Sequence, residues 1–178
     1  IGRASRVSII NAFLLLSAKN LEILPLVVKE LRARGLDHVR FVITMKPEDF
    51  DRYLGGEQEG IVNVGPVKPA ECPSLYAECH GLFMPTLAEC FSASYPEAMV
   101  MEKPIVTTDL GFARSICGDA ALYYKPMSAV SAADAIVRLL TESGLQDTLI
   151  QNGKRRVVQF DSAADRARKI LEVCELVL

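Results

Sequence analysis

The chain has 178 residues, half of them hydrophobic, and a formal net charge of −2. This size predicts one domain with a sizeable core, and the near-neutral charge gives no electrostatic basis for binding nucleic acid or an acidic membrane surface. No apolar run approaches the roughly 20 residues of a membrane span, and no signal peptide pattern opens the sequence. The five cysteines match neither a disulfide framework nor a zinc site, which favours a reducing cytoplasm.

Apolar runs in the first half of the chain predict strands at 7–13, 39–45 and 61–64. Residues 19–34 carry apolar side chains at three- and four-residue spacing, which is typical of an amphipathic helix, and Gly35 is placed to end it. Pro25 lies inside that helix and is expected to kink it or to shift its start. A short helix is expected at 47–53.

In the second half, the pattern predicts a helix at 73–78 and strands at 81–84, 104–108 and 121–124. From Ser128 onward the sequence is helical in character, with breaks expected at Gly144 and Gly153. Since this last third contains no strand, its helices are expected to pack on the sheet. The alternation predicts an α/β fold over residues 1–178: a Rossmann-like parallel sheet with helices on both faces. The G-x-G-x-x-G turn of dinucleotide-binding proteins is absent, so a nicotinamide or flavin cofactor is not supported.

Two carboxylates, Glu89 and Glu97, lie eight residues apart on either side of a loop-to-helix junction. A buried strand precedes them at 81–84 and another follows at 104–108. This order places both side chains near the carboxyl edge of a parallel sheet, which is where open α/β sheets bind ligands.

The residues around this pair carry a family resemblance. Residues 85–92 read PTLAECFS and residues 97–106 read EAMVMEKPIV. They resemble the donor-site motif of the retaining GT-B glycosyltransferases of the group 1 family, P-S-x-x-E-G-F-G-x-x-x-x-E-A-M-A-x-G-x-P-V-V. The match runs from about Ser8 to Phe160, and residues 108–124 are similar to a branch common in bacterial surface-polysaccharide synthesis.

The resemblance implies roles for the two carboxylates. It implies that Glu97 accepts hydrogen bonds from the ribose hydroxyls of a nucleotide, for which the two oxygens of a carboxylate are suited. The alternative is a capping box in which Ser94 is the N-cap and Glu97 only folds back on its own helix. It implies for Glu89 a catalytic position facing the transferred sugar, where its charge could stabilise an oxocarbenium-like transition state; the alternative is a solvated loop carboxylate.

Between the carboxylates, a helix N-terminus offers backbone N–H groups to a phosphate or a sugar oxygen. The substrate-binding residues expected here are Phe91, Ser92, Ala93 and Ser94. Cys90 and Ser92 replace the two glycines that usually flank the Phe, which leaves the geometry of this loop open. Cys90 is not favoured as a nucleophile, because no histidine lies near it in sequence.

Lys19 matches the lysine that binds the donor diphosphate in the family, whereas Leu14 stands where the family has an arginine. A solvated lysine in the first turn of a helix is the alternative. Lysine at that end of a helix is electrostatically unfavourable unless an anion is near, which favours the binding role.

The resemblance implies that the chain is the donor-binding half of a two-domain, hexosyl-type glycosyltransferase. A nucleotide-diphosphate sugar would be the donor, and a saccharide or lipid-linked acceptor would be bound by an N-terminal domain outside this chain.

The resemblance also implies that transfer retains the anomeric configuration and serves capsule or lipopolysaccharide synthesis. The enzyme would be cytoplasmic or peripheral at the inner membrane face, and this half alone would be inactive. The resemblance implies transfer without a metal, so neither a metal nor another cofactor is expected. A non-catalytic nucleotide-sugar binding module and a nucleotide-sugar epimerase of related fold are the alternatives.

Overall fold

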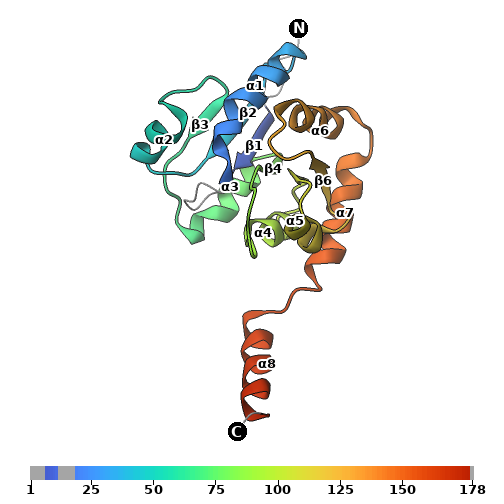
Figure 1. Ribbon diagram of the computed structural model, residues 1–178. Helices are drawn as coiled ribbons and strands as arrows, with labels where there is room; N and C mark the ends of the chain where they lie inside the picture. The colour runs from blue at the N-terminus through green and yellow to red at the C-terminus, as the bar shows by residue number, and fades with distance from the viewer. Residues whose placement is uncertain (1–6, 12–18, 177–178) are drawn as a thin grey trace.

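A computed structural model describes residues 7–11 and 19–176 of the protein, and its centre is a parallel β-sheet (Figure 1). The strands of the described chain, in the spatial order β3-β2-β1-β4-β5-β6, all run in the same direction. Their bounds are β1 Val7–Asn11, β2 Val39–Ile43, β3 Ile61–Asn63, β4 Gly81–Met84, β5 Ile105–Thr108 and β6 Ala121–Tyr124. The strand order reverses between β1 and β4, and ligands of doubly wound folds bind at the carboxyl edge beside such a switch point.

Helices connect the strands and cover both faces of the sheet. They are η2 Leu21–Ile23, α1 Leu24–Ala33, α2 Pro47–Leu54, η3 Pro69–Glu71, α3 Cys72–Glu78, α4 Ser94–Val100, α5 Gly111–Cys117, α6 Ala129–Thr141, α7 Leu145–Val157 and α8 Ala163–Glu175. The predicted strand at 7–13 is confirmed over Val7–Asn11, and its last two residues lie outside the described chain. Among the described residues, no helix combines the length and apolar character needed to cross a membrane.

Two hydrophobic clusters show how the sheet is covered. All residues of the central strands β4 and β5 are buried, as expected for parallel strands with helices on both sides. On β4, Phe83 belongs to the cluster beneath α1, α2 and α6, while its neighbours Leu82 and Met84 belong to the cluster beneath α3, α4 and α5. The predicted Rossmann-like architecture, with helices on both faces of a parallel sheet, is confirmed.

Pro25 shifts the start of the first helix rather than kinking it. Asn20 adopts a left-handed conformation with φ 53°, a 3-10 turn follows, and α1 begins at Leu24 with Pro25 in its first turn. Proline is accommodated there because its missing N–H has no partner in the first turn of any helix. Gly35, at φ 77°, follows the end of the helix as predicted.

The break predicted at Gly153 is wrong, because this glycine lies inside α7. A Cβ atom at Gly153 would lie 3.2 Å from Cγ of Met99 on α4, which is tighter than ordinary packing. The glycine therefore permits a close approach of α7 to α4, and the chain leaves its helical path only after Val157. The break predicted at Gly144 is confirmed, since this residue precedes α7 with φ 75°.

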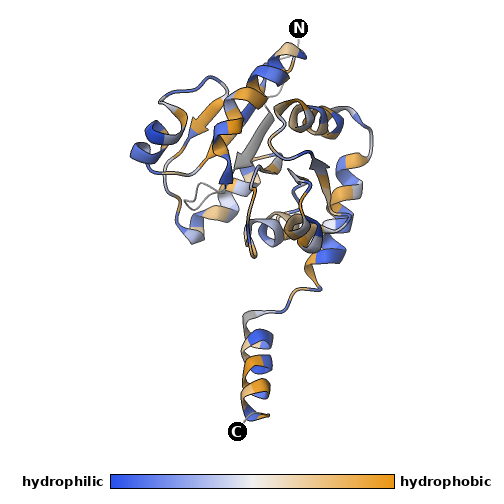
Figure 2. Ribbon diagram, in the orientation of Figure 1, coloured by the Kyte–Doolittle hydropathy of each residue, from blue (hydrophilic) through white to orange (hydrophobic). Residues whose placement is uncertain are grey.

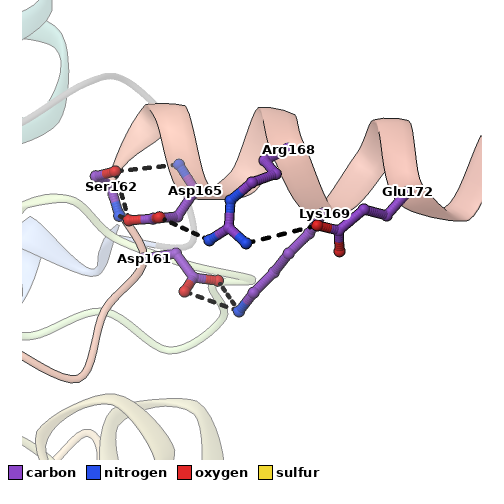
Figure 3. Close-up of polar contacts among 6 residues, drawn as sticks. All are labelled: Asp161, Ser162, Asp165, Arg168, Lys169 and Glu172. Carbon is purple, nitrogen blue, oxygen red and sulfur yellow. Dashed lines mark hydrogen bonds and ion pairs between the residues drawn. The ribbon is translucent and has the colours of Figure 1, made fainter.

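The prediction that the whole last third packs on the sheet is correct for α6 and wrong for α8. Figures 1 and 2 show α8 extending away from the sheet, with hydrophobic residues distributed along it. Ile170 and Leu171 are each 63% exposed. Local contacts stabilise this helix instead of a core (Figure 3): Ser162 and Asp165 form a capping box, and Arg168 pairs with Asp165 and Glu172 one turn away on either side. Lys169 pairs with Asp161 at 2.7 Å.

Candidate functional site

The loop that follows β4 carries the candidate residues and is fixed to the neighbouring strand β5. The Thr108 hydroxyl donates to the carbonyl of Thr86 at 2.7 Å, and the Thr107 hydroxyl donates to the carbonyl of Met84 at 3.1 Å. The Tyr95 hydroxyl, at the start of α4, lies 2.7 Å from Oγ1 of Thr107. All three side chains are buried. These hydrogen bonds fix the loop at both of its ends, so the segment from 85 to 93 has a defined path along the sheet edge.

Lys19 and Glu89 meet at this edge although they are 70 residues apart in sequence. The Lys19 ammonium donates to Oε2 of Glu89, and their side chains are 11% and 22% exposed. The Asn20 side-chain amide, next to Lys19, donates to the carbonyl of Pro85 at 3.3 Å and joins the same two segments. Because both charges are largely withdrawn from water, the structure contradicts both solvated alternatives.

Glu97 is not part of a capping box. The residue before α4 is Ala93, whose φ of −61° and ψ of −25° are already helical, and no side chain caps this helix. Ser94 is therefore the first helical residue and lacks the extended conformation that an N-cap requires. The Glu97 carboxylate instead accepts a hydrogen bond from the Tyr76 hydroxyl on α3, with 3.3 Å between the two oxygens.

A pocket of about 720 Å³ opens between α3 and α4 and is bounded by the start of α8 and the segment before it. Its lining comprises Pro69, Cys72, Pro73, Tyr76, Phe91, Ala93, Pro96, Glu97, Val100, Met101, Gln159, Phe160, Asp161 and Arg166. Most of these side chains are apolar, and a few polar groups stand among them, which is the usual composition of a small-molecule site. The rings of Phe91 and Phe160 meet edge to face at 6.0 Å on one wall.

The structure divides the predicted site residues into two groups. Glu97, Phe91 and Ala93 line the pocket, whereas Lys19 and Glu89 form the ion pair at the edge of the sheet. Ser92 is buried and Ser94 is half-buried in the turn that enters α4, and neither lines the pocket. Leu14, where the family has an arginine, lies outside the described residues.

The sequence did not point to Tyr76, Cys72 or Arg166, all of which line the pocket. Tyr76 and Cys72 are on α3 and Arg166 is on α8, so no local motif joins them to Glu97. Burial first, and the Glu97 charge second, raise the pKa of the Tyr76 phenol well above its usual range. The same two causes raise the pKa of the Cys72 thiol. Both groups are therefore held neutral beside the carboxylate.

Within the described residues, no three or more histidine, cysteine, aspartate or glutamate side chains are grouped so as to hold a metal ion. Cys90, next to Glu89, is exposed.

Several solved structures share the fold of this chain at less than 20% identity. Sucrose-phosphate synthase from Thermosynechococcus elongatus superposes with a TM-score of 0.77 at 18% identity, over 98% of this chain and 46% of its own. A UDP-forming trehalose-phosphate synthase from Burkholderia vietnamiensis superposes with a TM-score of 0.80 at 15% identity, over 96% of this chain and 46% of its own. Anabaena HepE, solved in complex with UDP and glucose, superposes with a TM-score of 0.76 at 19% identity, over 96% of this chain and 48% of its own. The chain thus spans about half the length of these proteins and has the fold of one half of a GT-B enzyme.

No curated protein sequence matches the chain significantly. The family model described as "Glycosyl transferases group 1" matches residues 7–142, which is most of the chain. The match includes β1 to β6 and both motif carboxylates. The chain therefore belongs to the group 1 family of glycosyl transferases.

Proposed function

We propose that this chain is the donor-binding half of a retaining glycosyltransferase, which transfers a hexose from a nucleoside diphosphate sugar to an acceptor hydroxyl. The observation that carries the proposal is the placement of the two motif carboxylates. Glu89 pairs with Lys19 at the carboxyl edge of the sheet, and Glu97 stands in a pocket large enough for a nucleoside. A ligand that joins a sugar to a nucleoside through a diphosphate would meet both groups.

In this arrangement the nucleoside occupies the pocket between α3 and α4, and Glu97 accepts hydrogen bonds from the ribose hydroxyls. The neighbouring backbone from Phe91 to Ser94 approaches the diphosphate at the start of α4. Anabaena HepE, which has a similar fold, was solved with UDP and glucose, and this supports the proposed arrangement.

Lys19 would hold the diphosphate without having to abandon Glu89 completely. Its ammonium donates to Glu89 and would also meet the phosphate oxygens of the donor. As the ammonium engages the phosphates, the carboxylate loses part of its compensating charge. Glu89 then faces the sugar, where negative charge stabilises positive charge that develops at the anomeric carbon. Lysine and backbone donors would serve the leaving group in place of a metal.

The acceptor would be a saccharide or a lipid-linked saccharide, bound by a second domain as the half-length match to other enzymes suggests. We place the reaction in capsule or lipopolysaccharide synthesis, in the cytoplasm or at the inner face of the membrane. The basis for this placement is the likeness of residues 108–124 to that branch of the family. The isolated chain is then expected to bind donor and to transfer nothing.

Calorimetry on the purified chain tests the proposal. UDP, GDP and ADP are titrated, and the tightest of them should bind better than the matching monophosphate and nucleoside. Glu97→Gln should weaken the diphosphate about tenfold, since a hydrogen bond to a charged group contributes about 1.5–3 kcal/mol. Glu48→Gln, which changes an exposed carboxylate on α2, should leave binding unchanged. No binding of any of the three diphosphates would refute the proposal.

One observation favours a second function, a nucleotide-sugar binding module without catalysis. Leu14 replaces the arginine that the family uses beside its lysine, which removes one cation from the diphosphate site. Under this alternative, the chain still binds a nucleotide sugar. A protein that contains both halves then neither hydrolyses the nucleotide sugar nor transfers its sugar.

A further inference from the structure

Tyr76 lines the pocket together with Glu97 and lies outside the sequence motif. Its side chain is 3% exposed, and its ring belongs to the hydrophobic cluster beneath α3, α4 and α5. Its hydroxyl donates toward Oε2 of Glu97 at 3.3 Å and toward the carbonyl of Ser94 at 3.4 Å, so one proton is shared between two acceptors of α4. The ring therefore anchors α3 in the core, while the hydroxyl reaches the functional carboxylate.

We propose that Tyr76 is a positioning residue, which holds the Glu97 carboxylate in the orientation that receives the ribose hydroxyls. This inference rests on the proposed donor-binding function. A glutamate side chain rotates about three bonds, and Glu97 is an exposed residue at the start of a seven-residue helix. The contact from Tyr76 engages Oε2 and leaves Oε1 and further lone pairs free to accept donors from a ligand.

The electrostatics of the pair suit this task. A cation in the place of Tyr76 would neutralise Glu97 and compete with the ligand for it, as Lys19 does for Glu89. A phenol gives one neutral hydrogen bond and leaves the negative charge in place. Burial and the Glu97 charge raise the pKa of this phenol above its usual range, so it is a hydrogen-bond donor at neutral pH. The carboxylate is thus oriented and still attractive to the vicinal hydroxyls of ribose.

A purely structural role for the hydroxyl is the competing explanation, because the bond to the Ser94 carbonyl also joins α3 to α4. The two explanations differ in what they predict for ligands. A structural role affects any nucleotide in the pocket equally. A positioning role acts through Glu97, and so it acts only on the ribose hydroxyls that Glu97 binds.

The test is a double-mutant cycle of Tyr76→Phe and Glu97→Gln, measured by calorimetry with the tightest of UDP, GDP and ADP and with its 2′-deoxy counterpart. Phenylalanine keeps the buried ring and removes only the hydroxyl. Tyr76→Phe should weaken the ribose form about fivefold, in the range of one net hydrogen bond, and should weaken the 2′-deoxy form less, because only the 3′ hydroxyl remains for Glu97 to bind. In the Glu97→Gln background the same change should have a smaller effect, because the neutral amide binds the ribose hydroxyls less strongly and its orientation then matters less.

Equal losses for the ribose and 2′-deoxy forms, or an undiminished loss in the Glu97→Gln background, would overturn the inference and leave the proposed function intact. If Glu97→Gln itself changes neither ligand, the proposed role of Glu97 fails, and the inference fails with it. Thermal unfolding of each variant shows whether the fold persists. Should Tyr76→Phe not fold, Tyr76→Leu, which keeps an apolar side chain in the cluster, replaces it in the cycle.

Discussion

Glu89 and Glu97 are the same residue type, eight positions apart, yet their surroundings are opposite. Glu89, which follows β4, is largely buried and paired with Lys19, which follows β1, so the ion pair joins the two sides of the switch point. Glu97 stands in an open pocket and contacts a neutral hydroxyl. The charge of Glu89 is compensated by Lys19, whereas Glu97 accepts a hydrogen bond from a neutral donor.

The difference shows how one short motif can serve two parts of a ligand. A paired carboxylate costs less to keep away from water than an unpaired one, and its charge becomes more effective when its cation binds another anion. An oriented carboxylate without a cation is ready to accept hydroxyl donors from the start. Under the proposed function, Glu89 acts on the reacting sugar and Glu97 binds the nucleoside, and four experiments test this division.

The largest effect is expected for Glu89→Gln in a protein that contains both halves. Glutamine keeps the shape and can still accept a hydrogen bond from Lys19, but it has no charge to stabilise the developing sugar cation. Turnover should fall by about 10²–10³, the typical cost of lost transition-state stabilisation. Affinity of the donor-binding chain for nucleoside diphosphate should stay within about twofold, because a lost interaction with the sugar leaves nucleotide contacts intact. Full activity of this variant would remove Glu89 from the catalytic role.

Lys19→Met should produce the next largest change, in binding rather than in turnover alone. It removes the cation proposed for the diphosphate and leaves Glu89 without its partner, so the site would repel a phosphate. Calorimetry should show a loss of about tenfold to a hundredfold for the nucleoside diphosphate, as expected for a charge-assisted contact plus repulsion. The nucleoside without phosphates is the internal control and should bind as before. Equal losses for both ligands would indicate a change of fold at the sheet edge.

Glu97→Gln should weaken the nucleoside diphosphate about tenfold, and the nucleoside by a similar factor, because the lost contact is to the ribose. This pattern is the reverse of that for Lys19→Met, which spares the nucleoside. The pair of variants therefore separates the two halves of the ligand. An unchanged affinity in a folded Glu97→Gln variant would leave this carboxylate without a ligand-binding role.

The sheet and the site edge could be predicted because their signals are local. Continuous apolar runs at 81–84 and 105–108 are typical of strands buried on both faces, and the chain order alone put Glu89 and Glu97 after one of them. The capping-box alternative failed because the same local spacing has two structural solutions. Ser94 and Glu97 have capping-box spacing, but the helical dihedrals of Ala93 start the turn before Ser94 can cap it.

The remaining features depend on contacts between distant segments. Glycine often ends a helix, yet Gly153 lies inside α7, where Met99 of α4 packs closely against it and leaves little room for a side chain. The helical pattern of 163–175 did not indicate whether the apolar side chains of this helix pack against the sheet. Tyr76 reaches Glu97 only because α3 and α4 lie on the same face of the sheet. Such pairings require the three-dimensional fold.

The smallest effect is expected from removal of divalent metal. If Lys19 and the backbone at the start of α4 meet the diphosphate, its charge is compensated by the protein, and binding does not depend on Mg²⁺ or Mn²⁺. Affinity for the nucleoside diphosphate should change by less than about twofold between excess EDTA and millimolar Mg²⁺, within the modest effect of ionic conditions on partly screened charges. The Lys19→Met variant sharpens the comparison, because the loss of its cation should make binding more dependent on added Mg²⁺. A strict metal requirement in the unmodified chain would show that Lys19 does not fulfil the role proposed for it, and Glu89 and Lys19 would then form a structural ion pair.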